Sequence, residues 1–156
     1  YIRPEKDKNW HLMADGLTDK IISFDTRHYP DGTYFIKIEA SDLPANPPGT
    51  EKKVEKISRP VVIDNSLPEV KNFVATKTNR GLEVSFSAVD KYSYIEEVKF
   101  LIRPDDWQLV FPVDGLCDST SESFKFSLNL MAGSDNLMII RVKDSFGNIG
   151  VYQYNF

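Results

Sequence analysis

The sequence predicts an all-β protein built from two antiparallel β-sandwiches in tandem. Three observations predict this fold: apolar and polar residues alternate along most of the chain, turn-forming residues separate the alternating runs, and a set of short motifs recurs about 100 residues later. The apolar stripe of an amphipathic helix, with its period of about 3.6 residues, is not found in any ten-residue stretch.

The strands are predicted by runs in which every second residue is apolar, as in residues 34–40, 82–88 and 124–130. Alternation places one set of side chains in a core and the other in water, which is typical of antiparallel sheets. Turn signals separate such runs, namely Asp31-Gly32, Asn79-Arg80-Gly81, Asp114-Gly115 and Gly147-Asn148.

The internal repeat is the most informative feature of the sequence. Five blocks align in one order, with offsets that drift as small loop insertions would make them drift. The first-copy residues are Ile2-Arg3-Pro4, Trp10, Asp15-Gly16-Leu17, Phe24 and then Ile36, Ile38, Ala40, Asp42 and Asn46. Their counterparts are Ile102-Arg103-Pro104, Trp107, Asp114-Gly115-Leu116, Phe126 and then Met138, Ile140, Val142, Asp144 and Asn148.

The repeat divides the chain into a first domain, residues 1–66, and a second domain, residues 67–156. Two strand-like runs, 70–77 and 82–90, open the second copy, whereas Ile2-Arg3-Pro4 corresponds to the end of its third strand. We therefore expect the first domain to lack its two opening strands, which exposes sheet edges and part of a core. Another segment or a partner would supply them, and the second domain should be the more self-sufficient.

The junction between the copies is predicted to be short and stiff. The last strand of the first copy ends at Asp64-Asn65, and Pro68 follows closely. Proline fixes its own φ and restricts Leu67 before it, so the junction should limit the angle between the domains.

Composition excludes several classes of function. The 156 residues carry a net charge of −4, without the clustered basic face of a nucleic-acid-binding protein. No apolar run approaches the roughly 18 residues of a membrane span, so we expect no membrane insertion of this segment. A single cysteine, Cys117, rules out an internal disulfide and a multi-thiolate zinc site. The chain begins at Tyr1 without a leader, so we expect that it was cut from a longer protein.

The sequence gives no sign of catalysis. His11 and His28 are the only histidines, and the nucleophile elbow Gly-x-Ser-x-Gly is missing. Acidic neighbours should raise the pKa of Cys117 rather than activate its thiol. We therefore predict that this chain is not an enzyme, and no cofactor is indicated.

Calcium binding is the most specific alternative role that the sequence suggests. The candidate ligands are acidic and amide residues at turns and at the junction, namely Asp42, Asn46, Asp64, Asn65, Asp144 and Asn148. Asp90, at the end of a predicted strand, would join the junction residues. Asp and Asn at such places more often close turns by accepting hydrogen bonds from backbone N–H groups. Because the chain has no EF-hand-like run, we favour turn closure and predict no metal site.

Two tryptophans at matching repeat positions, Trp10 and Trp107, are the candidates for interaction. An exposed tryptophan on a sandwich face can stack on a sugar ring. The alternative is that both pack on the core or cover a sheet face. Recurrence in both copies favours this structural role, because fold-determining positions recur while grafted sites need not.

Three motifs resemble those of fibronectin type III and bacterial immunoglobulin-like modules. Residues 31–42, followed by Asn46, resemble the sixth strand of that family, and residues 144–148 are similar to its common Asp-x-x-Gly-Asn turn. Residues 62–68 resemble the Val-Asp-Asn-Thr-Pro-Pro junction between tandem copies in secreted bacterial proteins. The second copy departs from the pattern, because Asn136 stands where the first copy has Tyr34. If Tyr34 makes a tyrosine-corner hydrogen bond, the second domain lacks that device.

The resemblance implies two tandem immunoglobulin-like, fibronectin III-like sandwiches, the first without its opening strands. It implies a non-catalytic structural or interaction module at the C-terminus of an extracytoplasmic bacterial propeller, adhesin or hydrolase protein. The location would be the periplasm, the cell surface or the medium, and the partner an upstream domain of the parent chain or another protein. The alternatives are a carbohydrate-binding module with an exposed aromatic face and an accessory domain of a secreted hydrolase.

Overall fold

The computed structural model describes residues 1–47, 49–129 and 137–156, and it is all-β, as predicted. Every strand pairing in it is antiparallel. The chain divides into two compact units, Tyr1–Asp64 and Asn65–Phe156. Among the described residues, the helical segments are two 3-10 turns, and neither is long enough to cross a membrane.

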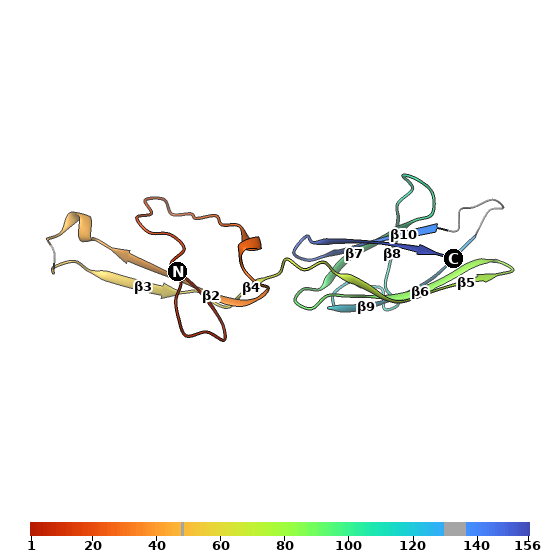
Figure 1. Cartoon of the computed structure of the whole chain (residues 1–156), viewed down its shortest axis with the longest axis horizontal. Coiled ribbons are helices and arrows are strands. Elements are labelled where there is room, and N and C mark those ends of the chain that lie inside the picture. The colour runs from red at the N-terminus through yellow and green to blue at the C-terminus, as the bar shows by residue number, and fades with distance from the viewer. Residues whose placement is uncertain (48, 130–136) are drawn as a thin grey trace. The chain divides into compact units, whose positions relative to one another are not determined.

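The second unit consists of two facing sheets. One has the strand order β11-β10-β7-β8 and the other β5-β6-β9, and Figure 1 shows β10 and β11 on the opposite side of this unit from β5, β6 and β9. The strands are β5 (Glu69–Thr78), β6 (Gly81–Val89), β7 (Ile95–Leu101), β8 (Gln108–Val110), β9 (Ser121–Leu128), β10 (Leu137–Asp144) and β11 (Ile149–Asn155).

One apolar core lies between these two sheets, which makes the second unit a β-sandwich. The alternating residues of β6 and β10 supply most of it, and aromatic rings join the two layers. Phe100 of β7 stacks on Phe126 of β9 with ring centroids 4.7 Å apart. The fully or almost fully buried members are Leu82, Val84, Phe86, Ala88, Ile95, Val98, Phe100, Val110, Phe124, Met138, Ile140 and Val142.

The first unit has a single four-stranded sheet within residues 1–47 and 49–64. β1 and β3 flank β2, and β4 pairs with β2 beyond the end of β3. Pro60 has no backbone N–H to donate, which accounts for the break between β3 and β4. The elements are β1 (Ile2–Pro4), η1 (Thr26–His28), β2 (Gly32–Ser41), η2 (Leu43–Ala45), β3 (Lys53–Ile57) and β4 (Val61–Ile63).

The core of the first unit is small. Ile2, Tyr34 and Ile63 are its buried members, with Met13 and Tyr29 packed against them. The Tyr34 hydroxyl donates a hydrogen bond of 2.6 Å to the carbonyl of Pro30, four residues earlier in the chain. Asn136, its counterpart in the second copy, lies outside the described residues.

Pro68 is fixed firmly to the second unit. Its side chain is fully buried, and its carbonyl accepts a hydrogen bond of 2.7 Å from the Tyr152 hydroxyl. Gly150 permits this contact, because a Cβ at that position would lie 2.4 Å from the Pro68 carbonyl oxygen. The rigid part of the second unit therefore begins no later than Pro68.

Candidate functional site

Trp10 lies beneath two cationic side chains rather than in the core of the first unit. The Arg3 guanidinium is 5.1 Å from its ring centroid, and the Lys37 ammonium is 5.4 Å from it. The side chain of Lys37, on β2, also bonds the carboxylate of Glu39. The two cations therefore interact with the indole in a cation–π arrangement.

Trp107 has a similar place on the second unit. The Arg141 guanidinium of β10 lies 5.0 Å from its ring centroid, and the ring is 37% exposed. Arg141 also approaches Glu97 to 3.4 Å, and Lys99 lies 2.7 Å from the same carboxylate. Lys99, with help from Arg141, holds the pKa of Glu97 below its ordinary value. The two tryptophans thus cover sheet faces and lie outside both buried cores.

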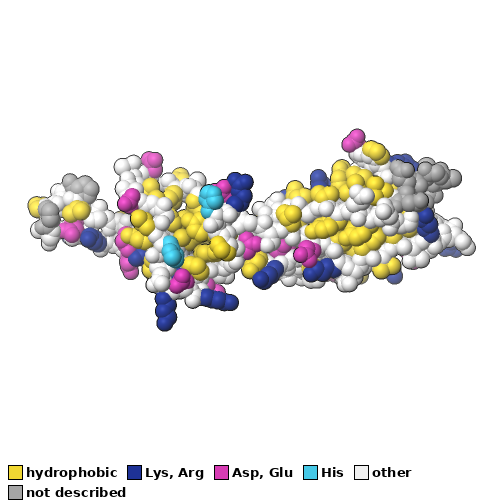
Figure 2. Space-filling model, viewed as in Figure 1, with side chains coloured by type: hydrophobic (Ala, Val, Ile, Leu, Met, Phe, Trp, Pro, Cys, Tyr) yellow, Lys and Arg dark blue, Asp and Glu magenta, His cyan; other side chains and the backbone are white. Residues whose placement is uncertain are grey.

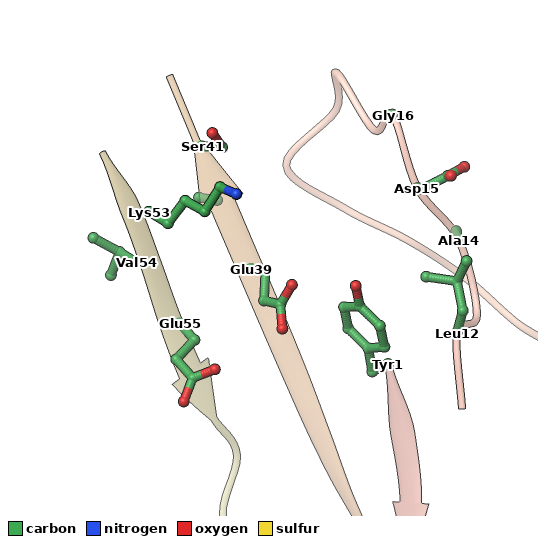
Figure 3. Close-up of a pocket in the computed structure, with 11 residues that line it drawn as sticks. Tyr1, Leu12, Ala14, Asp15, Gly16, Glu39, Ser41, Lys53, Val54 and Glu55 are labelled. Carbon is green, nitrogen blue, oxygen red and sulfur yellow. The ribbon is translucent and has the colours of Figure 1, made fainter. Parts of the chain in front are cut away.

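A groove of about 460 Å³ opens on the first unit beside Tyr1 (Figure 3). The carboxylate of Glu39 points toward the Tyr1 ring, and its hydrogen bond raises the pKa of the Tyr1 hydroxyl. Asp15, Glu55 and Lys53 also line the groove. Because carboxylates outnumber the ammonium group in this lining, the groove disfavours anionic ligands.

The two repeat-related turns use their acids differently. In the second unit the Asp144 carboxylate is fully buried and accepts hydrogen bonds of 2.9, 2.8 and 2.8 Å from Phe146 N, Asn148 N and Asn148 Nδ2. In the first unit Asp42 is exposed; one of its carboxylate oxygens accepts from Lys52 N at 2.7 Å. Asn46 Nδ2 donates to the Asp42 backbone carbonyl and not to its side chain.

Two further acids of the second unit close loops. Asp90 Oδ1 accepts hydrogen bonds from the backbone N–H of Tyr92 and of Ser93 and from the Ser93 hydroxyl, at 2.8, 2.9 and 3.1 Å. Glu122 is almost fully buried, and its Oε1 accepts from the backbone N–H groups of Asp118 and Ser119. Glu122 was not among the predicted residues, although its place at the start of an alternating run, directly after Ser-Thr-Ser, is a signal for a loop that closes there.

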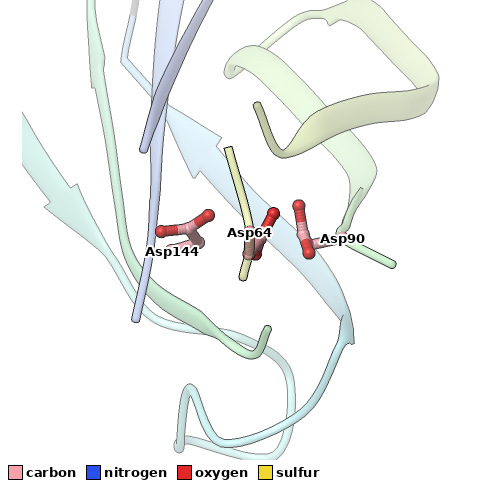
Figure 4. A group of neighbouring side chains, drawn as sticks. All are labelled: Asp64, Asp90 and Asp144. Carbon is pink, nitrogen blue, oxygen red and sulfur yellow. The ribbon is translucent and has the colours of Figure 1, made fainter. Parts of the chain in front are cut away.

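Asp90 and Asp144 also have Asp64, which directly precedes the second unit, as a neighbour. Each of the three residues offers a carboxylate oxygen, and these oxygens lie within 4.8 Å of one another (Figure 4). Carboxylate oxygens in such a group are the ligand type that calcium prefers. The hydrogen bonds from N–H groups to Asp90 and Asp144 also offset part of their negative charge. Asp42 is not a member of this group of acids, whereas Asn148 adjoins it through the hydrogen bond that its Nδ2 donates to Asp144.

Cys117 is held in an unreactive form. Burial, reinforced by Glu122, Asp114 and Asp118, raises the pKa of its thiol to about 11. The predicted direction is confirmed, but burial is a larger cause than the acidic neighbours. Because the thiolate is the nucleophile, this thiol is poorly suited to covalent catalysis at neutral pH.

No protein-family model, curated protein or solved structure matches this chain. The resemblance to immunoglobulin-like modules therefore rests on sequence motifs alone, and any function has to be argued from the side chains themselves.

Proposed function

We propose that this chain is a non-catalytic structural and interaction module of a larger extracytoplasmic bacterial protein, where it spaces or docks a partner domain. Each unit is assigned to the immunoglobulin-like, fibronectin III-like sandwiches. The assignment of source and location rests on the motifs at residues 62–68 and 144–148, which resemble those of secreted bacterial modules.

The observation that carries this proposal is how the second unit uses its polar side chains. Asp90, Glu122 and Asp144 accept backbone hydrogen bonds that close its loops, and Arg141 covers Trp107. The Cys117 thiol has a raised pKa. These carboxylate, guanidinium and thiol groups could bind ligands or react in other proteins. Here the carboxylates and the guanidinium stabilise loops and a sheet face, as a rigid spacer requires.

The junction supports the spacing role. Pro68 is buried in the second unit, and the last strand of the first unit, β4, ends at Ile63. Few residues are left between these two fixed points, and Pro68 restricts Leu67 as well. Short connections of this kind transmit orientation between domains better than flexible linkers do.

The spacing role is tested by measuring distances between spin labels on the two units. Cys117→Ser is combined with Lys56→Cys and Lys125→Cys, which place labels on exposed positions of β3 and β9. We expect a narrow distance distribution. Insertion of Gly-Gly-Ser after Ser66 should broaden it, while the same insertion after Gly49, within a loop of the first unit, should not. A parent distribution as broad as that of the junction insertion contradicts the proposal.

Carbohydrate binding is the second candidate, and the partial exposure of Trp107 favours it. Affinity electrophoresis in gels that contain soluble β-glucan or xylan tests this role. Retardation of the parent chain that is lost in Trp107→Ala, and kept in Tyr94→Ala, supports a sugar-binding face. Tyr94 is the matched control because it is also an exposed aromatic residue of the second unit. An accessory role in a secreted hydrolase remains a proposal about the parent protein.

A further inference from the structure

β8 is an outer strand of its sheet in the second unit. Within the described part of the chain it pairs on one side, with β7, and ends the strand order β11-β10-β7-β8. In an antiparallel strand, every second residue directs its backbone N–H and C=O away from the neighbouring strand. The outer side of β8 therefore presents backbone groups with which a further strand can pair.

The side chains along this edge are apolar and exposed at every second position. They are Trp107 at 37%, Leu109 at 49%, Phe111 at 65% and Val113 at 71% exposure. Val110 and Pro112, which separate the last three, are buried. Figure 2 shows that apolar side chains reach the surface of this unit. The segment thus continues the alternation of a strand, with one set of side chains inside and the other at the surface.

β9, an outer strand of the opposite sheet, has a different edge. Its exposed positions carry serine or lysine, namely Ser121, Ser123, Lys125 and Ser127. Polar and charged residues, lysine above all, protect an edge against pairing with another chain. On the sheet of β8, Lys99 lies opposite Leu109 on β7, inside the sheet, and pairs with Glu97 at 2.7 Å. The outer edge of β8 therefore lacks the protection that β9 has.

The charge around this edge is negative. Residues 104–118 contain four aspartates and no basic residue. Asp105 and Asp106 directly precede Trp107, Asp114 directly follows Val113, and all three acids are exposed. A strand with basic residues at its ends complements this distribution of charge.

We propose that the outer edge of β8 accepts an extended strand from a partner polypeptide, a proposal that rests on the docking role above. The donated strand carries apolar residues at alternate positions, which meet Leu109 and Phe111, and lysine or arginine at its ends, near the aspartates. Its backbone pairs with residues 107–111, because Pro112 has no N–H to donate. This is strand addition, in which main-chain hydrogen bonds supply affinity and alternate side chains supply specificity.

A second copy of the chain is a poorer occupant of this edge. Antiparallel pairing of two β8 strands around Leu109 brings Asp105 of one copy to the neighbourhood of Asp114 of the other. Parallel pairing in register places Asp105 and Asp106 beside the same residues of the second copy. Like charges at such positions are destabilising. The aspartates that favour a basic partner therefore oppose a dimer formed through β8.

The test is hydrogen exchange of the full chain with a strand peptide. The probe is the acetylated and amidated peptide Lys-Lys-Val-Thr-Ile-Thr-Val-Lys-Lys, which has alternate apolar residues and basic ends. We expect amide exchange in residues 107–111 to slow by on the order of tenfold at saturation, because new backbone hydrogen bonds protect the outer amides. The same peptide with glutamate in place of lysine should give no protection, and equal protection by both peptides overturns the proposal.

A pair of double variants shows whether the peptide binds at β8. Leu109→Ser with Phe111→Ser removes the apolar contacts and should weaken binding of the lysine peptide by on the order of tenfold. Both residues are exposed, so the fold should be retained, which thermal melting checks. Ile149→Ser with Val151→Ser is the matched control on β11, the other outer strand of this sheet, at 43% and 59% exposure. Retained affinity in the first variant, or an equal loss in both, overturns the proposal.

The acidic end of the edge is tested by Asp105→Asn with Asp106→Asn. Asp105 has a φ of +63°, in the left-handed region that asparagine also adopts, so the backbone should be retained. We expect the affinity for the lysine peptide to fall by about threefold to tenfold, because two complementary charges are lost. An unchanged affinity contradicts the assignment of a basic partner.

Two other outcomes also overturn the proposal. One is the absence of protection in residues 107–111 at saturating or highest soluble peptide concentration. The other is a stable dimer of the parent chain that Leu109→Ser with Phe111→Ser dissociates, because β8 would then be an interface between copies.

Failure of this proposal can be told apart from failure of the proposed function. The spin labels lie on β3 and on β9, and β9 belongs to the opposite sheet, so their distances test the spacing role without involving β8. The sugar-binding test depends on Trp107→Ala, whereas Trp107 stays unchanged in every variant of the peptide test.

Discussion

The two units share a sequence pattern and differ in what covers it. In the second unit, the alternating residues of β10 face β6 and β9 and are excluded from water. In the first unit, Tyr34 of β2 is buried, whereas Ile38 and Ala40 on the same strand are exposed to solvent. The comparison teaches that alternation selects which side chains share a face, whereas burial of that face depends on a second layer of sheet.

The largest expected effect is a difference between matched substitutions at repeat positions. Ile140→Ala should lower the free energy of unfolding of the second unit by about 2–5 kcal/mol, because it leaves a cavity in a closed core. Ile38→Ala should change the stability of the first unit by less than about 0.5 kcal/mol, since the side chain is already mostly in water.

Chemical denaturation followed by tryptophan fluorescence measures both effects. Trp10→Phe leaves Trp107 as the reporter of the second unit, and Trp107→Phe leaves Trp10 as the reporter of the first. Similar losses of stability in the two variants would show that Ile38 is buried in solution, and the contrast between the units would fail.

A second matched pair compares the turns after β10 and β2. Asp144→Ala should cost about 1.5–3 kcal/mol, because three N–H groups in a buried turn lose a charged acceptor. Asp42→Ala should cost less than about 0.5 kcal/mol, because its carboxylate is exposed and water replaces it. The same single-tryptophan variants report the two transitions, and equal costs would mean that both turns depend on their acids to the same extent.

Much of the fold was predictable because strands and turns leave local signals in the sequence. Features that depend on pairing with a distant segment were not predictable. Alternation and turn residues are local signals, so the antiparallel strands followed from them. The state of residues 19–25 is not local. Phe24 matches Phe126 in the repeat, yet Phe126 belongs to a strand only because β6 lies beside it. A local sequence motif therefore does not specify which strand, if any, will lie beside it and pair with it.

The acids illustrate the same limit at the level of the site. Asp144 with Asn148 was recognisable as a turn-closing pair, because both residues lie within five positions of each other. The meeting of Asp90, Asp144 and Asp64 depends on three separate segments, and only the suggestion that Asp90 joins the junction residues anticipated it. The repeat predicts that Trp10 and Trp107 pack on the core or cover a sheet face, but it does not predict their cationic partners, which lie on β1, β2 and β10.

A smaller effect is expected at the tryptophans. Arg141→Ala should uncover Trp107, increase its quenching by acrylamide, and cost about 0.5–1 kcal/mol of cation–π energy. Lys37→Ala should change the quenching of Trp10 less, because Arg3 still lies over that ring. Equal increases in the two quenching constants would show that Arg3 does not shield Trp10.

The last prediction is that calcium does not bind to the junction acids and does not change the stability of either unit. Asp90 Oδ1 accepts three hydrogen bonds, and both oxygens of Asp144 accept hydrogen bonds from N–H donors. These donors offset part of the charge that would otherwise favour a cation at the junction acids. After chelator treatment, calorimetric titration with calcium should therefore give no heat, and the melting temperature of each unit should stay unchanged. The contrary result, a rise in the melting temperature of the second unit that Asp90→Asn removes and Asp42→Asn keeps, would make the junction acids a calcium site and give the two units a further difference.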